Sequence, residues 1–147
     1  MNDDNQAPAA GAKVPIWYWA AAIGALLFEC AGAYLFTDSL SLDPAMLPLD
    51  QRALYDATPQ WMTIIWAVAI GTGLVGALGL ILRRRFSALF LLASTVAVAG
   101  QLVGILLIQQ LRELMPEDQF ILQVVIFFVA YAFWQTARLA SRRGWLR

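Results

Sequence analysis

The chain contains no histidine and a single cysteine, Cys30. With only one cysteine, an intramolecular disulfide is excluded, and the absence of histidine removes the most versatile metal ligand and the base of a serine–histidine–acid triad. The apolar segments hold no pair of carboxylates, and the chain has no phosphate-binding loop. The sequence therefore predicts that the protein is not an enzyme and that it binds no metal and no cofactor.

Charge is also scarce. Charged residues make up 14% of the chain and hydrophobic residues 61%, whereas soluble domains are typically about 25% charged and roughly 45–50% apolar. The net charge is zero, which gives no indication of nucleic-acid binding. This composition is typical of a membrane protein that crosses the bilayer several times and has little mass outside it.

Four apolar segments are long enough to cross a bilayer as helices, which takes about 20 residues each. The first contains one acidic residue, Glu29, and the second and third contain no charged residue at all. The sequence therefore predicts an all-α fold, a bundle of four transmembrane helices within residues 14–140. The spans are expected at residues 14–36, 61–82, 86–111 and 120–139.

The segments outside the predicted spans are short. Residues 1–13 are polar and are expected to form a flexible tail, and residues 141–147 are expected to form a basic tail with Trp145 at the membrane interface. The connection from residue 37 to residue 60 is the longest. In it, Asp43-Pro44 is typical of a helix start, and residues 50–57 are expected to form a second short helix. That helix is interpreted as lying on the membrane surface, and the alternative is a lid over a cavity.

The ten Lys and Arg residues are unevenly divided between the two ends of the predicted bundle. Basic residues are enriched on the cytoplasmic side of membrane proteins. With both termini on one side, eight of the ten lie there, so both termini are predicted to be cytoplasmic. The eight are Lys13, Arg83, Arg84, Arg85, Arg138, Arg142, Arg143 and Arg147, and the other two are Arg52 and Arg112.

Glu29 is the most informative residue for function. A carboxyl group inside the membrane is costly and normally faces other helices or water. Alanine and glycine residues share its side of the helix, and such small residues indicate contact with another helix. Counting residues from the outer end of each predicted span puts Glu29 and Gln101 at similar expected depths, in the outer half of the membrane. The predicted ligand site comprises Glu29, Trp66, Gln101, Gln123 and Tyr131, with Thr63 and Phe127 nearby.

Two hypotheses explain Glu29. In the structural one, the carboxyl is protonated or hydrogen-bonded to Gln101 or Tyr131 and fixes the helix register, through bonds worth about 0.6–2 kcal/mol. In the functional one, Glu29 gains and loses a proton as a solute or cation binds. The sequence favours the functional hypothesis for Glu29 and the structural one for Gln101. Cys30 is expected to be an inert packing residue.

The glycine residues indicate helix packing. Residues 71–76 match the dinucleotide-binding pattern G-x-G-x-x-G, but they lie inside an apolar span with no acidic residue about 20 positions later. They are better explained by small residues at a spacing of four, which let two helices approach closely. Gly100-x-x-x-Gly104 has the same spacing, and either internal packing or a dimer interface explains it. The predicted packing residues are Gly73, Ala77, Gly100 and Gly104.

Several local features occur together along nearly the whole chain: Gly32-Ala33-Tyr34, Tyr55, Pro59-Gln60-Trp61, the arginine turn and the closing Arg143-Gly144-Trp145-Leu146-Arg147. In these features the chain resembles a group of small four-helix bacterial inner-membrane proteins, some of which are labelled sugar transporters. The resemblance implies a multi-pass protein of the bacterial inner membrane. Members of that group usually carry asparagine where this chain has Glu29.

The leading functional prediction is transport of a small solute across the membrane. Four helices are few for a transport path, so a transporter of this size is expected to be a homodimer. The alternative is a non-transporting scaffold or an accessory subunit of a larger membrane complex. No inverted repeat is evident in the sequence, which counts against transport. Small multidrug-resistance exporters share the layout of four helices with one acid in the first, but their loops are much shorter.

Overall fold

The computed structural model describes residues 13–147, and all regular secondary structure in that range is helical. Apart from Lys13, the predicted flexible tail at residues 1–13 lies outside the described residues. The four helices α1, α3, α4 and α6 are long and apolar enough to cross a membrane, which confirms the predicted fold class. They run as α1 (Ile16–Ser41), α3 (Gln60–Ile81), α4 (Phe86–Leu107) and α6 (Glu117–Arg142), with the short helices η1 (Pro44–Met46), α2 (Leu49–Ala57) and α5 (Gln109–Leu114) between them.

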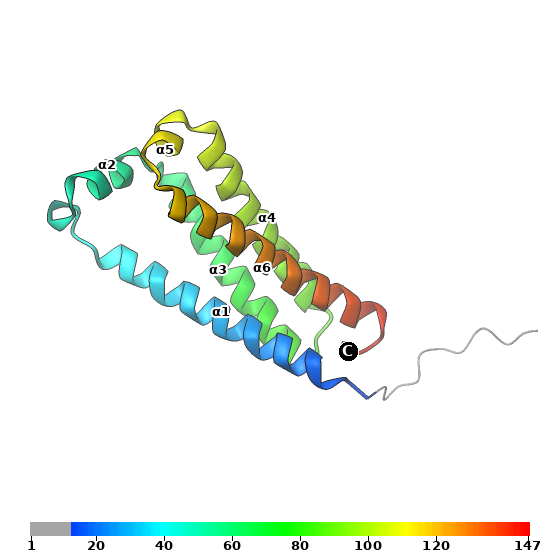
Figure 1. Ribbon diagram of the computed structural model, residues 1–147. Helices are drawn as coiled ribbons and strands as arrows, with labels where there is room; N and C mark the ends of the chain where they lie inside the picture. The colour runs from blue at the N-terminus through cyan, green and yellow to red at the C-terminus, as the bar shows by residue number, and fades with distance from the viewer. Residues whose placement is uncertain (1–12) are drawn as a thin grey trace, which may run out of the picture.

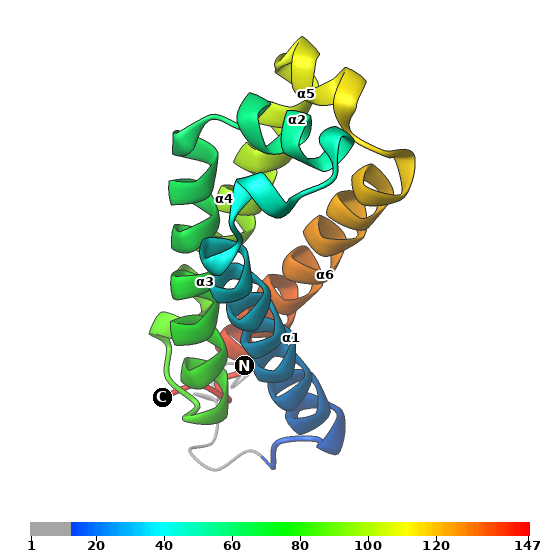
Figure 2. The ribbon, with the colours of Figure 1, turned by 90° about the vertical axis from the view of Figure 1, so that its left-hand side faces the viewer.

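The long helices run lengthwise between the two ends of the molecule, with α2 and α5 at one end (Figures 1 and 2), and α6 crosses α1 at an angle (Figure 2). The C-terminus, the start of α1 and the turn between α3 and α4 lie at the other end, which is called the base below. This arrangement places the described basic residues of the turn and of the C-terminal segment at one end of the bundle. The cytoplasmic orientation of that end remains a prediction.

Helix α1 continues to Ser41, beyond the predicted end at Phe36. Three hydroxyl groups in this extra turn donate hydrogen bonds to carbonyl oxygens of the same helix. Thr37 bonds Tyr34 at 2.9 Å, and Ser39 and Ser41 bond carbonyl oxygens three residues earlier, each at 2.7 Å. Of these acceptors, the carbonyl oxygen of Asp38 is one that the helix end leaves without an intrahelical partner, and the hydroxyl of Ser41 serves it. Polar residues thus continue the helix past its apolar segment.

The third span is shorter than predicted, because α4 ends at Leu107 rather than near residue 111. Ile108 adopts an extended conformation (φ −88°, ψ 103°), and the chain turns there into α5. This turn buries Leu111 to 1% exposure in a cluster with Met62 and Ile105. A straight continuation of α4 would carry Leu111 away from that cluster.

The fourth span is longer than predicted. Helix α6 begins at Glu117, next to the N-cap residue Pro116, and ends at Arg142. Glu117 and Asp118 lie in its first turn and Arg142 in its last, where their charges interact favourably with the helix dipole. The charged residues that flank the apolar segment therefore belong to the helix itself.

Both short helices expected in the long connection are present. Asp43 caps η1 by accepting a hydrogen bond of 2.9 Å from the backbone N–H of Ala45. Helix α2 matches the short helix predicted over residues 50–57. Leu54 and Ala57 of α2 pack against the Met62–Ile105–Leu111 cluster. Helix α2 therefore covers one end of the bundle together with α5, and both remain attached through apolar contacts.

Helices α3 and α4 form the tightest pair in the bundle, because glycine residues of α3 let the two backbones approach. A Cβ atom added at Gly76 would lie 3.0 Å from the backbone nitrogen of Leu91, and one added at Gly79 would lie 3.2 Å from the Cα of Ser87. The Ser87 hydroxyl donates a hydrogen bond of 2.9 Å to the carbonyl oxygen of Gly76. Small residues of α3 thus allow its backbone to lie close to that of α4.

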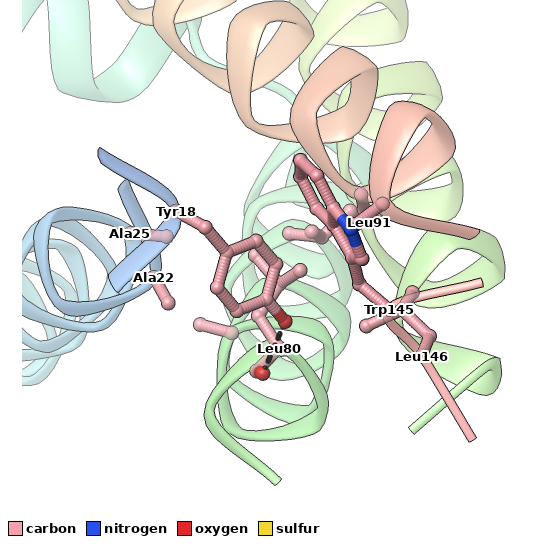
Figure 3. Close-up of a cluster of buried hydrophobic side chains, with 10 residues drawn as sticks. Tyr18, Ala22, Ala25, Leu80, Leu91, Trp145 and Leu146 are labelled. Atoms are coloured by element: carbon pink, nitrogen blue, oxygen red, sulfur yellow. Dashed lines mark hydrogen bonds between the residues drawn. The ribbon is translucent and has the colours of Figure 1, made fainter. Parts of the chain in front are cut away.

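A cluster of buried side chains closes the base of the bundle (Figure 3). Tyr18 is fully buried, and its hydroxyl donates a hydrogen bond of 2.6 Å to the carbonyl oxygen of Leu80. The sequence predicted Trp145 in a basic tail at the membrane interface, but Trp145 and Leu146 are only 6% and 1% exposed. That prediction is corrected, because the last residues fold back onto the bundle at Gly144, whose φ is 69°.

The folded-back C-terminus is held by the turn that joins α3 to α4. The backbone N–H of Arg147 donates to the carbonyl oxygen of Arg83 at 2.6 Å, and that of Arg85 donates to Arg147 at 3.1 Å. The Arg83 side chain also donates to the carbonyl oxygen of Trp145 at 2.9 Å. Arg83 therefore connects the two segments through both its backbone and its guanidinium group.

Candidate functional site

Glu29 faces helix α3, as predicted, and is only 5% exposed. Its carboxyl group lies in the space that a side chain at position 73 would fill, because a Cβ atom added at Gly73 would overlap all three carboxyl atoms. Ala69 and Ala77, one turn to either side of Gly73, are also buried. The small-residue face of α3 thus forms a gap that accommodates this carboxyl.

The carboxyl of Glu29 has no hydrogen-bonding partner among residues 13–147. Every fully enclosed side-chain nitrogen or oxygen in the same range has a hydrogen-bonding partner. Because the carboxyl of Glu29 has none, its oxygens are not completely enclosed. A carboxyl group with a purely structural role is normally satisfied by hydrogen bonds. The carboxyl oxygens of Glu29 therefore use none of their hydrogen-bonding capacity on the described residues.

The residues proposed as structural partners of Glu29 bond elsewhere. Gln101 donates to the carbonyl oxygen of Met62 at 3.4 Å and accepts from Gln123 at 3.5 Å. Tyr131 is 41% exposed, and its hydroxyl accepts a hydrogen bond from Gln135 of the same helix. The structure thus brings Gln101 and Gln123 together and leaves Tyr131 on the outer face of α6.

Trp66 lies on α3, and the pairing of α1 with α3 gives its level relative to Glu29. Helices α1 and α3 are antiparallel, and Gly32 lies opposite Ile70, while the rings of Phe36 and Trp66 are 5.1 Å apart. Trp66 precedes Gly73 by two helical turns, which is about 10 Å along the axis. The Trp66 ring therefore lies between the level of Glu29 and the end of the bundle that carries α2.

Gln101 is not at the depth of Glu29, and the prediction of similar depth is wrong. Helix α1 extends to Ser41, so Glu29 is about 18 Å from its end, whereas α4 ends at Leu107, so Gln101 is about 9 Å from its end. Glu29 is thus near the middle of α1, and Gln101 is near the level of Trp66. The error arose because the hydropathy pattern ended α1 too early and α4 too late.

Sequence reasoning missed two buried polar residues on α4. Ser94 and Thr95 are 3% and 5% exposed. Because Gly76 lies against Leu91, the antiparallel register of α3 and α4 places Gly73 opposite Ser94, at the level of Glu29. Thr95 bonds the carbonyl oxygen of Ala130 on α6 at 3.2 Å. The detectable signal was a pair of adjacent hydroxyl residues inside an apolar span.

The two residues of the Gly100-x-x-x-Gly104 motif have different surroundings. A Cβ atom added at Gly104 would lie 2.7 Å from the ring of Trp61, whereas nothing lies within 4 Å of one added at Gly100. The internal-packing interpretation therefore applies to Gly104 and not to Gly100. Gly73 and Ala77, the other predicted packing residues, are both buried.

The two best-formed pockets of the described residues do not reach Glu29. The larger lies between the ends of α4, α5 and α6, and has a volume of about 450 Å³. The smaller lies between α2 and the segment 114–119. The outer-half cavity predicted around Glu29 is thus not one of these two pockets.

Comparisons of this chain with models of protein families, with characterised proteins and with solved structures find no match.

Proposed function

We propose that this integral membrane protein moves a small solute across the bilayer and that Glu29 binds the solute or the proton coupled to it. The observation that supports this proposal is the carboxyl of Glu29 against Gly73, deep in the span and without a hydrogen-bonding partner among the described residues. Ionisable residues embedded in a membrane commonly mark substrate or proton pathways. The register of α3 and α4 puts Ser94, which is also buried, at the same level on α4.

The attachment of α1 to the bundle is consistent with movement of this helix. In the most apolar stretches, 17% of the residues of α1 and 11% of those of α6 are buried by protein, against 39% in α3. Next to Glu29, α1 contacts α6 through Phe28 and Phe133, whose ring centroids are 5.8 Å apart. A shift of α1 along the glycine and alanine face of α3 would move the carboxyl out of its gap toward one end of the bundle.

The substrate class and the assembly are part of the proposal. The sequence resemblance suggests a sugar, whose hydroxyl groups would bond the carboxylate of Glu29 and the hydroxyl of Ser94. A homodimer would supply the helices that a path between two compartments requires. The protein would lie in the bacterial inner membrane with both termini in the cytoplasm.

A second function is favoured by the pocket geometry. The two best-formed pockets avoid Glu29, and the outer faces of α1 and α6 carry large exposed apolar residues such as Leu27 and Phe128. An accessory subunit of a larger membrane complex would use such faces to contact other helices. In that case Glu29 would hold α1 in register on α3 and would not change during function.

Replacing Glu29 with glutamine distinguishes the two functions. Liposomes containing the purified protein and a pH-sensitive dye are diluted into a series of monosaccharides, and proton movement is recorded. We expect at least one sugar to drive proton movement in the wild type, and Glu29→Gln to reduce it by about tenfold or more, since glutamine carries no exchangeable acid. The control is Glu29→Asp, which keeps an acid and should retain part of the rate.

Sugar-driven proton movement that is unchanged in Glu29→Gln would contradict the proposal for this residue. The absence of movement for the whole sugar series in the wild type, with normal insertion of both proteins, would favour the accessory-subunit function. Size-exclusion chromatography of each variant shows whether the bundle has remained assembled.

A further inference from the structure

The larger pocket lies at the end of the bundle that carries α5, far along the chain from Glu29. Figure 2 shows α5 above the ends of α4 and α6, so this pocket is at the level where two spanning helices end. Its volume of about 450 Å³ is in the range of small-molecule sites, which is about 300–1,000 Å³. Its walls are mainly apolar: Ile105, Leu106, Met115, Phe120 and Ile121.

Two opposite charges complete the lining of this pocket. Arg112 lies in the last turn of α5, and Glu117 lies in the first turn of α6. The ion pair found among residues 13–147 joins Arg52 to Asp56, so Arg112 and Glu117 do not neutralise each other. The guanidinium group of Arg112 makes one long contact, 3.5 Å to the carbonyl oxygen of Leu106. Both charged groups can therefore bind a ligand at the mouth of the pocket.

The position of the pocket indicates the kind of molecule that would occupy it. The ends of membrane-spanning helices lie at the level of the lipid headgroups, and the apolar wall below them faces the acyl chains. A ligand with an apolar chain and a headgroup carrying both charges would fit the lining. A net negative headgroup is less suitable, because it brings no cationic group to pair with Glu117.

We propose that this pocket binds a zwitterionic phospholipid whose headgroup ends in a primary amine, as in phosphatidylethanolamine. Its phosphate accepts hydrogen bonds from Arg112, its ammonium group donates to the carboxylate of Glu117, and an acyl chain lies on the apolar wall. Phosphatidylcholine has the same charges, but its quaternary ammonium cannot donate a hydrogen bond. Phosphatidylglycerol has no cationic group for Glu117. This site is independent of the function proposed for Glu29.

The test measures lipid retention by native mass spectrometry of the protein in mild detergent. The probes are phosphatidylethanolamine, phosphatidylcholine and phosphatidylglycerol with identical acyl chains at equal concentrations. We expect the wild type to retain phosphatidylethanolamine about fivefold better than the other two, and Glu117→Gln to abolish this preference. Arg112→Gln should reduce retention of all three lipids, because each carries a phosphate.

Two variants at the same end of the bundle serve as matched controls. Arg52→Gln and Glu113→Gln remove the same charges at positions outside the pocket lining, and both should leave the lipid preference unchanged. Three results would overturn the proposal: equal retention of the three lipids by the wild type, stronger retention of phosphatidylglycerol, or an equal loss of preference in the control variants.

Discussion

Replacement of Trp145 with alanine should lower the free energy of unfolding by about 3–5 kcal/mol, the range observed for large aromatic side chains removed from cores. The indole of Trp145 is 6% exposed, and its ring centroid lies 5.6 Å from that of Trp17 and 6.0 Å from that of Tyr18. Removing the indole leaves a cavity where the C-terminus meets α1. Unfolding of the purified protein in mixed micelles titrated with SDS measures the change.

The matched control for this prediction is Trp19→Ala. Trp19 lies on α1 near the same end of the bundle but is 38% exposed, so it loses fewer contacts within the protein. We expect Trp19→Ala to lower the free energy of unfolding by less than half as much. Equal effects of the two substitutions would show that Trp145 contacts lipid headgroups and does not close the base of the bundle.

Replacement of Gly76 with leucine is expected to separate α3 from α4. A Cβ atom at this position would lie 2.7 Å from the Cγ of Leu91 and 3.0 Å from the Leu91 backbone nitrogen, so a rotamer change alone cannot relieve the clash. Overpacking of this kind costs about 3 kcal/mol when backbones must move apart. The same SDS titration should show this loss, and the Ser87–Gly76 hydrogen bond would be lost with it.

Gly71→Leu provides the control, because it makes the same chemical change on the same helix. Nothing lies within 4 Å of a Cβ atom added at Gly71, so its side chain extends away from the bundle. We expect a change within about 0.5 kcal/mol, as for other surface positions. Equal stability of the two leucine variants would contradict the close approach of α3 and α4 at Gly76.

The four spans could be predicted because bilayer physics acts on the sequence directly. The part of a helix that crosses the hydrocarbon core must be predominantly apolar, so long runs with few or no charged residues identify the spans with little tertiary information. The ends of the helices are set by other interactions. The hydroxyl groups of Thr37, Ser39 and Ser41 continue α1 past its apolar segment, and the burial of Leu111 ends α4 early.

The candidate site was predicted in part. Small residues beside Glu29 indicated correctly that it faces another helix, because alanine and glycine residues on one face of α1 let a neighbouring helix approach closely. The partner residue was not predictable, since it is Gly73, whose contribution is the side chain that it lacks. The predicted depth of Gln101 was wrong, because residues were counted from the ends of the apolar segments and not from the ends of the helices.

Trp145 and Gly100 show a second limit of sequence patterns. A tryptophan among arginines at the end of a chain is typical of a membrane interface, yet a turn at Arg143 and Gly144 folds Trp145 and Leu146 back onto the bundle. A glycine pair at a spacing of four indicates a small face, but does not say which helix covers it. Here Trp61 covers Gly104 and leaves Gly100 open.

The central claim is that Glu29 is an exchangeable acid inside the membrane, and its reaction with a carbodiimide tests this most directly. Membranes containing the protein are treated with a hydrophobic carbodiimide, which reacts with protonated carboxyl groups, and the modified residues are identified by mass spectrometry. We expect modification of Glu29 ahead of Asp38, Asp50 and Asp56, which lie in the last turns of α1 and in α2, with a slower reaction when a transported sugar is present. Modification confined to these three aspartates, with Glu29 unreacted, would contradict the claim.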